Sequence, residues 1–399
     1  MKKLLQVFTA LVLCLMLVAT TVVITYTKVT EYYFGGGSDG AQASAERIGG
    51  KAAELYACLD HYYIGQVDAG DLSDAACSAM VDAVGDEWSY YISAEDYAAH
   101  VEQLENAYVG VGITIQENED TGLLEVIAVA AGGPAEEAGV QTADQITAVD
   151  GQDVTQMTLE EIRALVRGEE GTQVVIDFLR DGQTVRVTLE RRSIQNVVAH
   201  GQLLESGDGY VIIDNFDGGC AAQTRAVVEE LQAQGAKAII FDVRFNPGGL
   251  KRELIELLDD LLPEGEIFRT VDYAGREEIS TSDADFLDLP MAVLVNVDSY
   301  SAAEFFAAAL QEYEAATIVG VQTYGKGRFQ SALQLSDGSA VNLSIGEYYT
   351  PQGRNLAGVG ITPDVVVELD EEDLEALYYG RLPLEEDAQL QTAIAALAQ

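Results

Sequence analysis

The chain has 399 residues, enough for roughly two or three domains, and 48% of its residues are hydrophobic, which allows sizeable cores. Its 66 acidic and 22 basic residues give a formal net charge of -44. Such a chain repels phosphate backbones, which excludes nucleic acid as a partner. The acidic residues are scattered along the sequence, which is typical of a solvated surface.

The cysteines indicate neither a metal site nor a required disulfide. The chain has 4 of them, and their positions match no metal-ligand spacing, so we expect no metal site. We also expect no cofactor. Cys14 lies in the apolar N-terminal run, and Cys58, Cys77 and Cys220 are far apart in the sequence. One disulfide and unpaired buried thiols remain equally compatible with this pattern.

The N-terminal segment predicts a membrane anchor. Lys2 and Lys3 precede an apolar run over residues 4–24, which is ~20 residues and long enough to cross a bilayer. The flanking charge places the N-terminus in the cytoplasm and the rest of the chain outside it, on a single-pass protein of the cell membrane. A cleaved signal peptide is the alternative, but no clear small-residue cleavage site follows. We therefore expect a cytoplasmic tip and anchor over 1–30 and a linker over 31–45.

Residues 46–96 predict an N-terminal helical segment. Leu55, Leu59 and Tyr62 recur at helical spacing, and a Gly-Asp-Leu-Ser turn at residues 70–73 precedes a second helix.

Residues 97–192 predict a mostly-β module with one helix. A glycine-punctuated loop at 108–112 runs into an alternating strand, and a Gly-Pro-Ala-Glu-Glu-Ala-Gly segment follows at 133–139. An Ile-Thr-Ala-Val-Asp-Gly segment, a helix and two further strands complete the module. This order resembles a PDZ domain of the type found in processing proteases.

The glycine-rich loop of this module predicts a peptide-binding site. Successive backbone N–H groups around Gly110, Val111 and Gly112 can hold a terminal carboxylate, and the bound tail adds to a sheet edge beside Ile113. The alternative is that these glycines only make a tight turn.

Residues 193–370 predict an α/β core. Short apolar runs alternate with segments of helical periodicity, and this pattern indicates crossover units and a partly parallel sheet. The predicted strands and helices lie at residues 210–213, 221–234, 238–243, 291–297, 302–310 and 316–321.

Within this core, Ser301 is the candidate nucleophile. It lies where a buried strand changes to a helix N-terminus, and backbone N–H groups and the helix dipole face outward at such a position. Lys326, in a Gly-Lys-Gly turn, is the candidate base, because burial can lower the pKa of a lysine. Gln330 lies four positions further on and can orient the lysine without adding charge.

A second glycine motif predicts an oxyanion site. Asp242-Val243-Arg244-Phe245-Asn246-Pro247-Gly248-Gly249 follows a predicted strand. The N–H of Gly248 or Gly249, together with that of Ser301 or Ala302, is expected to bind the oxyanion of a tetrahedral intermediate. A simple strand-end turn is the alternative, because glycine is the default residue for positive φ.

These motifs together resemble the carboxyl-terminal processing peptidases, or tail-specific proteases. Residues 299–304 match the family's Ser-x-Ser-Ala-Ser/Ala-Glu, and residues 325–330 match its Gly-Lys-Gly-x-Val-Gln with Phe329 at the Val position. Residues 85–91 are similar to its Gly-Asp-Pro-Tyr-Ser-x-Tyr signature, with Glu-Trp in place of Pro-Tyr. The separation between the serine and the lysine is also that of the family.

The resemblance implies a ClpP/crotonase-like core with an inserted PDZ domain and a Ser301-Lys326 dyad assisted by Gln330. It covers roughly residues 46–370 and implies a serine endopeptidase that binds protein C-termini. Together with the anchor predicted from the N-terminal segment, this gives a membrane-anchored enzyme that acts outside the cytoplasm. A homodimer is plausible for this family. The last segment, 371–399, is acidic and then helical, and we favour a dimerisation arm over packing on its own core.

Other function classes fit less well. A proteolytically inactive PDZ scaffold that binds C-termini is the main alternative, although Ser301, Lys326 and Gln330 are all present. An acyl-CoA enzyme of the crotonase type is suggested by core architecture alone. A Ser-His-Asp hydrolase is disfavoured, because the chain has only 3 histidines and no Gly-x-Ser-x-Gly elbow around Ser301.

Overall fold

The structure is a computed structural model that describes residues 39–118, 121–130 and 132–398. The chain divides into two compact units, Met1–Ala76 and Cys77–Gln399. The predicted membrane span at 4–24 lies outside the described residues. Among the helices that are described, none is both long enough and apolar enough to span a bilayer.

Two helices form the start of the described chain, as the helical periodicity predicts. They are α2 (Asp39–Tyr62) and α3 (Ala69–Asp82). Of the cysteines that the structure describes, Cys58 and Cys220 carry free thiols.

The predicted PDZ module is a mostly-β unit built on one sheet. The strand order is β3-β4-β5-β7-β8, with β6 paired to β5. Alternate residues of β7 (Val174, Ile176 and Phe178) are fully buried in its core, as expected for a strand with one face covered. The other elements are β3 (Ile113–Glu117), β4 (Leu124–Val129), α5 (Pro134–Glu137), β5 (Gln145–Val149), β6 (Gln152–Asp153), α6 (Leu159–Val166), β7 (Gln173–Arg180) and β8 (Gln183–Glu190).

The module is inserted through a two-stranded stem. After α4 (Ala94–Leu104), strand β2 (Ala107–Gly110) carries the chain in, and the antiparallel strand β9 (Arg192–Gln195) carries it out. At the base of the stem, Asn106 Nδ2 donates to the Asn196 carbonyl at 3.0 Å and to the Gly218 carbonyl at 3.1 Å. Both ends of the insertion therefore meet at one place on the core.

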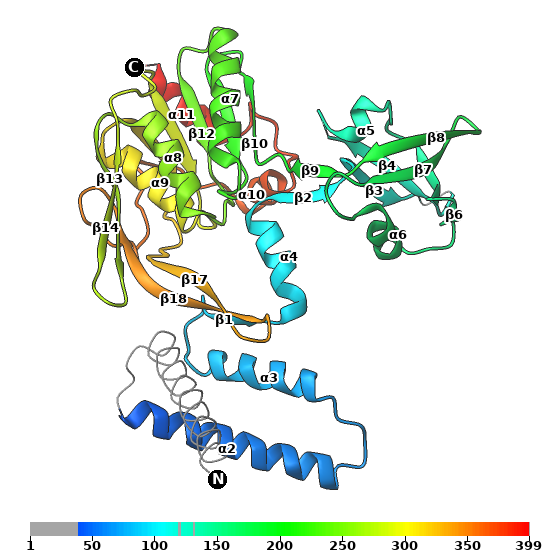
Figure 1. Ribbon diagram of the computed structural model, residues 1–399. Helices are drawn as coiled ribbons and strands as arrows, with labels where there is room; N and C mark the ends of the chain where they lie inside the picture. The colour runs from blue at the N-terminus through cyan, green and yellow to red at the C-terminus, as the bar shows by residue number, and fades with distance from the viewer. Residues whose placement is uncertain (1–38, 119–120, 131, 399) are drawn as a thin grey trace, which may run out of the picture. The chain divides into compact units, whose positions relative to one another are not determined.

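The core contains a largely parallel sheet with helices on both faces (Figure 1). The strand order is β10-β11-β12-β15-β16-β19, and every neighbouring pair is parallel except β10 with β11. The crossovers are helical because parallel neighbours cannot be joined by a tight turn. Its elements are β10 (Ala199–Leu203), β11 (Gly209–Ile213), α7 (Cys220–Ala233), β12 (Ile239–Asp242), α8 (Lys251–Leu261), β15 (Met291–Val295), α9 (Ala302–Glu312), β16 (Ala316–Gly320) and β19 (Val365–Val366).

Residue alternation along the central strand β15 divides the core into two layers. Val293 and Val295 pack with α7, α8 and α9, whereas Ala292 and Leu294 face the opposite side. All four side chains are fully buried. A strand buried on both faces explains why this stretch is continuously apolar in the sequence.

The opposite face of the sheet is covered by the C-terminal helix. α10 (Glu371–Tyr378) is followed by α11 (Ala388–Leu397), and Leu390 and Ala393 of α11 are buried against the sheet. The favoured expectation of a dimerisation arm is therefore wrong for α11, because its apolar side already covers this chain's own core.

A second sheet lies next to the nucleophile region. Its order is β1-β18-β13-β14, and β17 also pairs with β18. The strands are β1 (Tyr90–Ile92), β13 (Gly265–Asp272), β14 (Glu277–Ser282), β17 (Arg328–Gln334) and β18 (Ala340–Tyr349). β17 begins two residues after Lys326, so this sheet fixes the chain that carries the candidate base.

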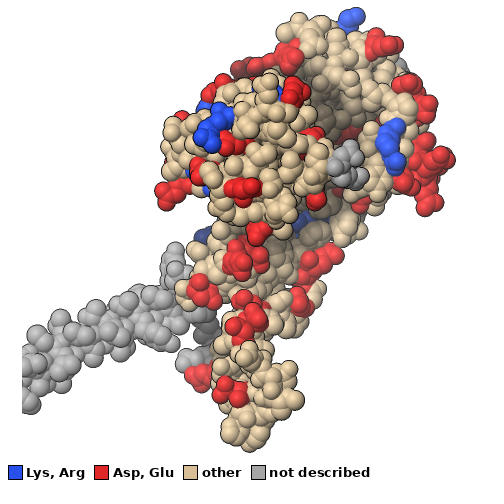
Figure 2. Space-filling view, turned by 90° about the vertical axis from the view of Figure 1, so that its right-hand side faces the viewer, with Lys and Arg blue, Asp and Glu red and all other residues tan. Residues whose placement is uncertain are grey.

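The surface agrees with the scattered acidic composition. Figure 2 shows acidic side chains spread over the visible face among neutral residues, with few basic side chains. Such a face keeps its charges in water and does not form one concentrated patch.

Candidate active site

Ser301 occupies a strained turn between β15 and α9. Its backbone has φ 59 and ψ -123, and the residue is only 5% exposed. A positive φ of this kind costs a non-glycine residue about 1–3 kcal/mol, so surrounding contacts must hold it. The turn follows the carboxyl end of β15, the edge at which open α/β sheets bind their ligands.

One buried carboxylate holds this turn to the segment of the candidate base. Glu304 Oε2 accepts the N–H of Ser301 at 3.0 Å and the N–H of Lys326 at 2.8 Å. Its Oε1 accepts the N–H of Gly325 at 2.7 Å and the Thr323 hydroxyl at 2.6 Å. Burial raises the pKa of Glu304, and these four hydrogen bonds oppose that rise only in part. The predicted nucleophile and base are thus brought together through their backbones.

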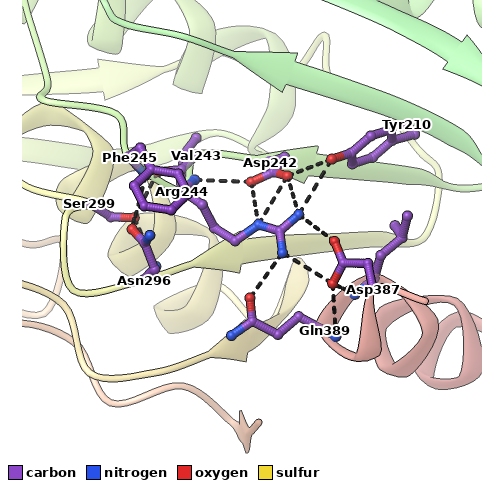
Figure 3. Close-up of polar contacts among 10 residues, drawn as sticks. Tyr210, Asp242, Val243, Arg244, Phe245, Asn296, Ser299, Asp387 and Gln389 are labelled. Atoms are coloured by element: carbon purple, nitrogen blue, oxygen red, sulfur yellow. Dashed lines mark hydrogen bonds and ion pairs between the residues drawn. The ribbon is translucent and has the colours of Figure 1, made fainter. Parts of the chain in front are cut away.

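The glycine loop after β12 is joined to the same turn. The Ser299 hydroxyl donates to the Val243 carbonyl at 2.7 Å, and Asn296 Oδ1 accepts the N–H of Phe245 at 2.9 Å (Figure 3). A Cβ placed on Gly248 would lie 2.7 Å from the Cβ of Ser301, so only glycine fits against this residue.

Arg244, in the same loop, anchors it to the C-terminal helix. Its guanidinium contacts Asp242 at 2.6 Å, Asp387 at 2.7 Å and Gln389 Oε1 at 3.0 Å (Figure 3). Tyr210 Oη donates to Asp242 Oδ2, the same oxygen that the guanidinium contacts, at 2.5 Å. The two carboxylates hold the pKa of Arg244 above its ordinary value despite burial. α11 therefore supports the loop that packs against Ser301.

The neutral form of the Lys326 amine is more favoured in this site than it would be in water. Burial lowers the pKa of Lys326 to about 8, although the charges of Asp86, Glu304 and Glu87 oppose this shift. Its Nζ lies 3.9 Å from the centroid of the Trp88 ring. At neutral pH an appreciable fraction of this lysine can thus serve as a base.

The side chains of the two predicted dyad members have other partners in this structure. Ser301 Oγ is hydrogen-bonded to Tyr348 Oη at 3.0 Å, and Lys326 Nζ faces Trp88. Burial raises the pKa of Tyr348 to about 12, which keeps its phenol protonated. Ser301 and Lys326, both described by the structure, lie in the same site, but no hydrogen bond joins Ser301 Oγ to Lys326 Nζ.

Gln330 does not orient Lys326 in this conformation. Its Nε2 donates to Ser344 Oγ at 3.0 Å and to the Arg328 carbonyl at 3.2 Å. A shift of strand register between Phe329 and Gln330 accompanies this arrangement. The expected contact with the lysine therefore requires another rotamer or a local backbone change.

The predicted oxyanion donors are not equivalent. The N–H of Gly248 donates to Asn246 Oδ1 at 2.8 Å, and that of Ser301 is bonded to Glu304. Both are unavailable to a ligand in this conformation, which corrects the assignment of Gly248. Within the described part of the chain, Gly249 and Ala302 are the two candidates whose N–H has no hydrogen-bond partner.

The predicted peptide site lies at an edge of the PDZ sheet. β3, which begins at Ile113, is the end strand and pairs with β4. Gly112 has φ +77, and the carbonyls of Val111 and Gly112 accept the N–H groups of Ala135 and Ala130 at 3.0 and 2.9 Å. Val111 is itself buried, and its backbone, together with Gly110, leads from the stem into this edge.

Three functional candidates were missed by sequence reasoning alone. Sequence reasoning gives Glu304 no role beyond its place in the Ser-Ala motif. A Glu three residues after a Ser is a capping-box signal, and this signal predicts the contact with the Ser301 backbone. Trp88 and Tyr348 come from distant segments, and no local pattern indicates their contacts with Lys326 and Ser301. Throughout the described ranges, no cluster of His, Cys, Asp or Glu could hold a metal ion.

Comparisons with known proteins identify the two domains. Residues 208–367 match the model of peptidase family S41, and residues 125–180 match a PDZ domain. The chain is 40% identical to a carboxyl-terminal-processing protease of Synechocystis over 65% of this chain and 62% of that protein. It is 30% identical to the carboxy-terminal processing protease CtpA of Bacillus subtilis over 84% of this chain and 70% of that protein.

A solved structure is also similar. The photosystem II D1 C-terminal processing protease is 26% identical, with a TM-score of 0.48, and the match covers 84% of this chain and 92% of that chain. The chain spans less than two thirds of the Synechocystis relative's length but 70% of the Bacillus relative's length. On the strength of the second match and of the two domain matches, this chain belongs to peptidase family S41, the carboxyl-terminal processing serine proteases with a PDZ domain.

Proposed function

We propose that this chain is an active endopeptidase in which Ser301 is the nucleophile and Lys326 the general base. The observation that carries the proposal is the pair of hydrogen bonds from the backbones of these residues to Glu304 Oε2, at 3.0 and 2.8 Å. That carboxylate keeps a strained serine beside a lysine whose pKa is lowered to about 8. Neither feature is expected of a surface turn.

The reaction follows from these positions. Neutral Lys326 takes the proton of Ser301 Oγ as the hydroxyl attacks a peptide carbonyl, and the N–H groups of Gly249 and Ala302 stabilise the oxyanion. Lys326 then returns the proton to the leaving amine, and water hydrolyses the acyl-enzyme. Before the attack, Ser301 must exchange Tyr348 for Lys326, and Gln330 then orients the lysine.

We assign substrate recognition to the PDZ module. The edge of β3 has backbone groups to which an extended tail can add as a further strand. The loop from Gly110 to Gly112 supplies N–H groups for the terminal carboxylate, and Ile113 lies at the start of the receiving strand. The substrates are then proteins with accessible, apolar C-termini.

The remaining assignments rest on sequence and topology. We propose that residues 4–24 anchor the chain in the cell membrane, with the catalytic part outside the cytoplasm, because a lysine pair precedes an apolar run of spanning length. The parallel core sheet with helical crossovers supports a ClpP/crotonase-like core. A homodimer would use a surface other than the apolar side of α11, which this chain already covers.

The test is turnover by the full-length protein of an unstructured substrate with an apolar C-terminus. Ser301→Ala and Lys326→Met should each abolish cleavage, whereas Lys237→Met, at an exposed position, should leave it unchanged. Amidating the substrate's C-terminus should raise KM with little effect on kcat, since only docking uses the carboxylate. Full activity of either dyad variant would refute the assignment.

The second candidate is an inactive PDZ scaffold. It is favoured by the resting partners of the dyad, since Ser301 Oγ contacts Tyr348 and Lys326 Nζ contacts Trp88. A fluorophosphonate probe separates the two functions, because it needs a reactive serine but no substrate. Labelling of the wild type, absent in Ser301→Ala, supports the peptidase; peptide binding with no labelling at any pH supports the scaffold.

A further inference from the structure

The surroundings of Lys326 Nζ include a cluster of three aromatic rings. Trp88 lies 5.9 Å from Tyr300 and 5.6 Å from Tyr324 between ring centroids, and these two tyrosines are 5.5 Å apart. The Nζ of Lys326 is 3.9 Å from the Trp88 centroid, well inside the range of a cation–π contact. Within the described part of the chain, this ammonium forms no ion pair.

Trp88 is held in place by its own backbone and neighbours. Asn342 Nδ2 donates to the Trp88 carbonyl at 3.2 Å, and the Ser344 N–H donates to Ser89 Oγ at 3.0 Å. Two residues later, β1 pairs with β18. The backbone that carries the indole is therefore attached to the sheet in which β17, the strand after Lys326, also pairs.

We propose that Trp88 is a positioning residue for the general base, and that its indole face holds the Lys326 ammonium apart from Ser301 until the dyad assembles. This inference rests on the proposed role of Lys326 as the base. A cation is attracted to the ring only while it carries its proton, so Trp88 stabilises the resting, protonated lysine and releases the neutral amine. Proton loss and movement towards Ser301 are thereby coupled.

Other charges face the same amine and must be considered. Asp86 and Glu87, from the segment that carries Trp88, and Glu304, from α9, all favour the protonated form. The phenol of Tyr324 donates to Glu87 at 3.3 Å, and Arg328 lies 3.8 Å from Asp86. None of these groups is removed by a change of Trp88, so such a change isolates the contribution of the ring.

The direction of the effect distinguishes a cation–π contact from simple burial. Removing the indole while keeping an apolar side chain, as in Trp88→Leu, removes the attraction and should move the acid limb of Ser301 reactivity to lower pH by about half a unit. Trp88→Phe keeps an aromatic ring that attracts a cation more weakly. Its reactivity should therefore rise at a pH between those of the wild type and Trp88→Leu. If the indole acted only by excluding water, the smaller side chains would admit water and move the limb to higher pH.

The chain provides its own spectroscopic probe, because Trp88 is its only tryptophan. We expect the Trp88 fluorescence of the full-length Ser301→Ala protein to change with pH as Lys326 loses its proton, with a midpoint at about 8. The excitation wavelength is one at which tyrosine does not absorb. The transition should disappear in the Ser301→Ala/Lys326→Met double variant. An unchanged transition in the double variant, or none in Ser301→Ala, overturns the contact.

Fluorophosphonate labelling of Ser301 against pH, in the wild type, Trp88→Leu and Trp88→Phe, tests the consequence for reactivity. Suppose that labelling requires Lys326, but that the pH at which the labelling rate rises is not lower in Trp88→Leu than in the wild type. The inference then fails while the proposed function stands. If the fluorescence titration is present but Lys326→Met labels at the wild-type rate, the contact is real and the proposed function fails.

Discussion

The backbone N–H of Ser301 and the backbone N–H of Lys326 donate to the same oxygen of a buried carboxylate, Glu304 Oε2. The two segments come from different parts of the core, the turn before α9 and the turn before β17. This shared acceptor keeps them adjacent whatever their side chains do. The proposed dyad therefore requires its two side chains to leave their present partners, Tyr348 and Trp88, while Glu304 keeps the two backbones adjacent.

Glu304→Gln should break this arrangement. An amide offers one acceptor oxygen, and its NH₂ group would face N–H donors, so we expect a loss of about 3 kcal/mol in the free energy of unfolding. Labelling of Ser301 by a fluorophosphonate should fall at least a hundredfold, because the strained turn loses its support. Glu229→Gln, at an exposed position, is the matched control and should change neither quantity. Wild-type labelling in Glu304→Gln would contradict the role of the carboxylate.

Activity should rise with pH through the titration of Lys326. The pKa of Lys326 is lowered to about 8, and only the neutral amine can accept the serine proton. The value of kcat/KM should therefore increase tenfold for each pH unit well below about 8 and level off above it. A profile that is flat from acid to alkaline pH would exclude lysine as the base.

Gly248→Ala should inactivate the protein by displacing Ser301, the proposed nucleophile. The added Cβ would lie 2.7 Å from Ser301 Cβ and 2.9 Å from the Ala302 nitrogen, at a residue with φ +90. Gly235→Ala is a stringent control, because Gly235 has φ +98 but no atom within 4 Å of the added group. The control should lose about 1–2 kcal/mol of stability from backbone strain alone and keep its activity. Similar labelling rates in both variants would show that the close approach is unimportant.

Asp387→Asn should weaken the attachment of α11 to the glycine loop. Arg244 would keep Asp242 but lose one of its two carboxylates in a buried setting, so we expect destabilisation of about 3–5 kcal/mol. Chemical denaturation measures the loss, with Glu386→Gln, on the exposed neighbour, as the control. A change below 1 kcal/mol would mean that Arg244 is adequately held without the C-terminal helix.

The sequence predicts the core well where its signals are local. The continuously apolar run at β15 predicts a buried strand, and the structure confirms it. The glycine-rich and Ser-Ala motifs place Ser301 at a strand-to-helix turn, where it is found. Such features depend on a few consecutive residues, and propensity and periodicity determine them.

The parts that escaped prediction depend on contacts between distant segments. The ring of Trp88 reaches Lys326 only because β1 adds to β18, and no pattern in residues 85–91 reveals that pairing. Gly248 was expected to offer its N–H to an oxyanion, but Asn246, two residues earlier, accepts it. The apolar side of α11 was interpreted as a surface for another subunit because periodicity identifies a buried face but not what buries it.

The stem of the PDZ module has a consequence for how such chains diversify. Asn106 Nδ2 donates to the carbonyls of Asn196 and of Gly218 in the core, and the Asn196 N–H donates to the Asn106 carbonyl. The points where the chain enters and leaves the module therefore lie side by side. A module whose two ends lie together can be exchanged for another by recombination without a change in the chain path of the catalytic domain. New target preferences can then be acquired while the chemistry is inherited intact.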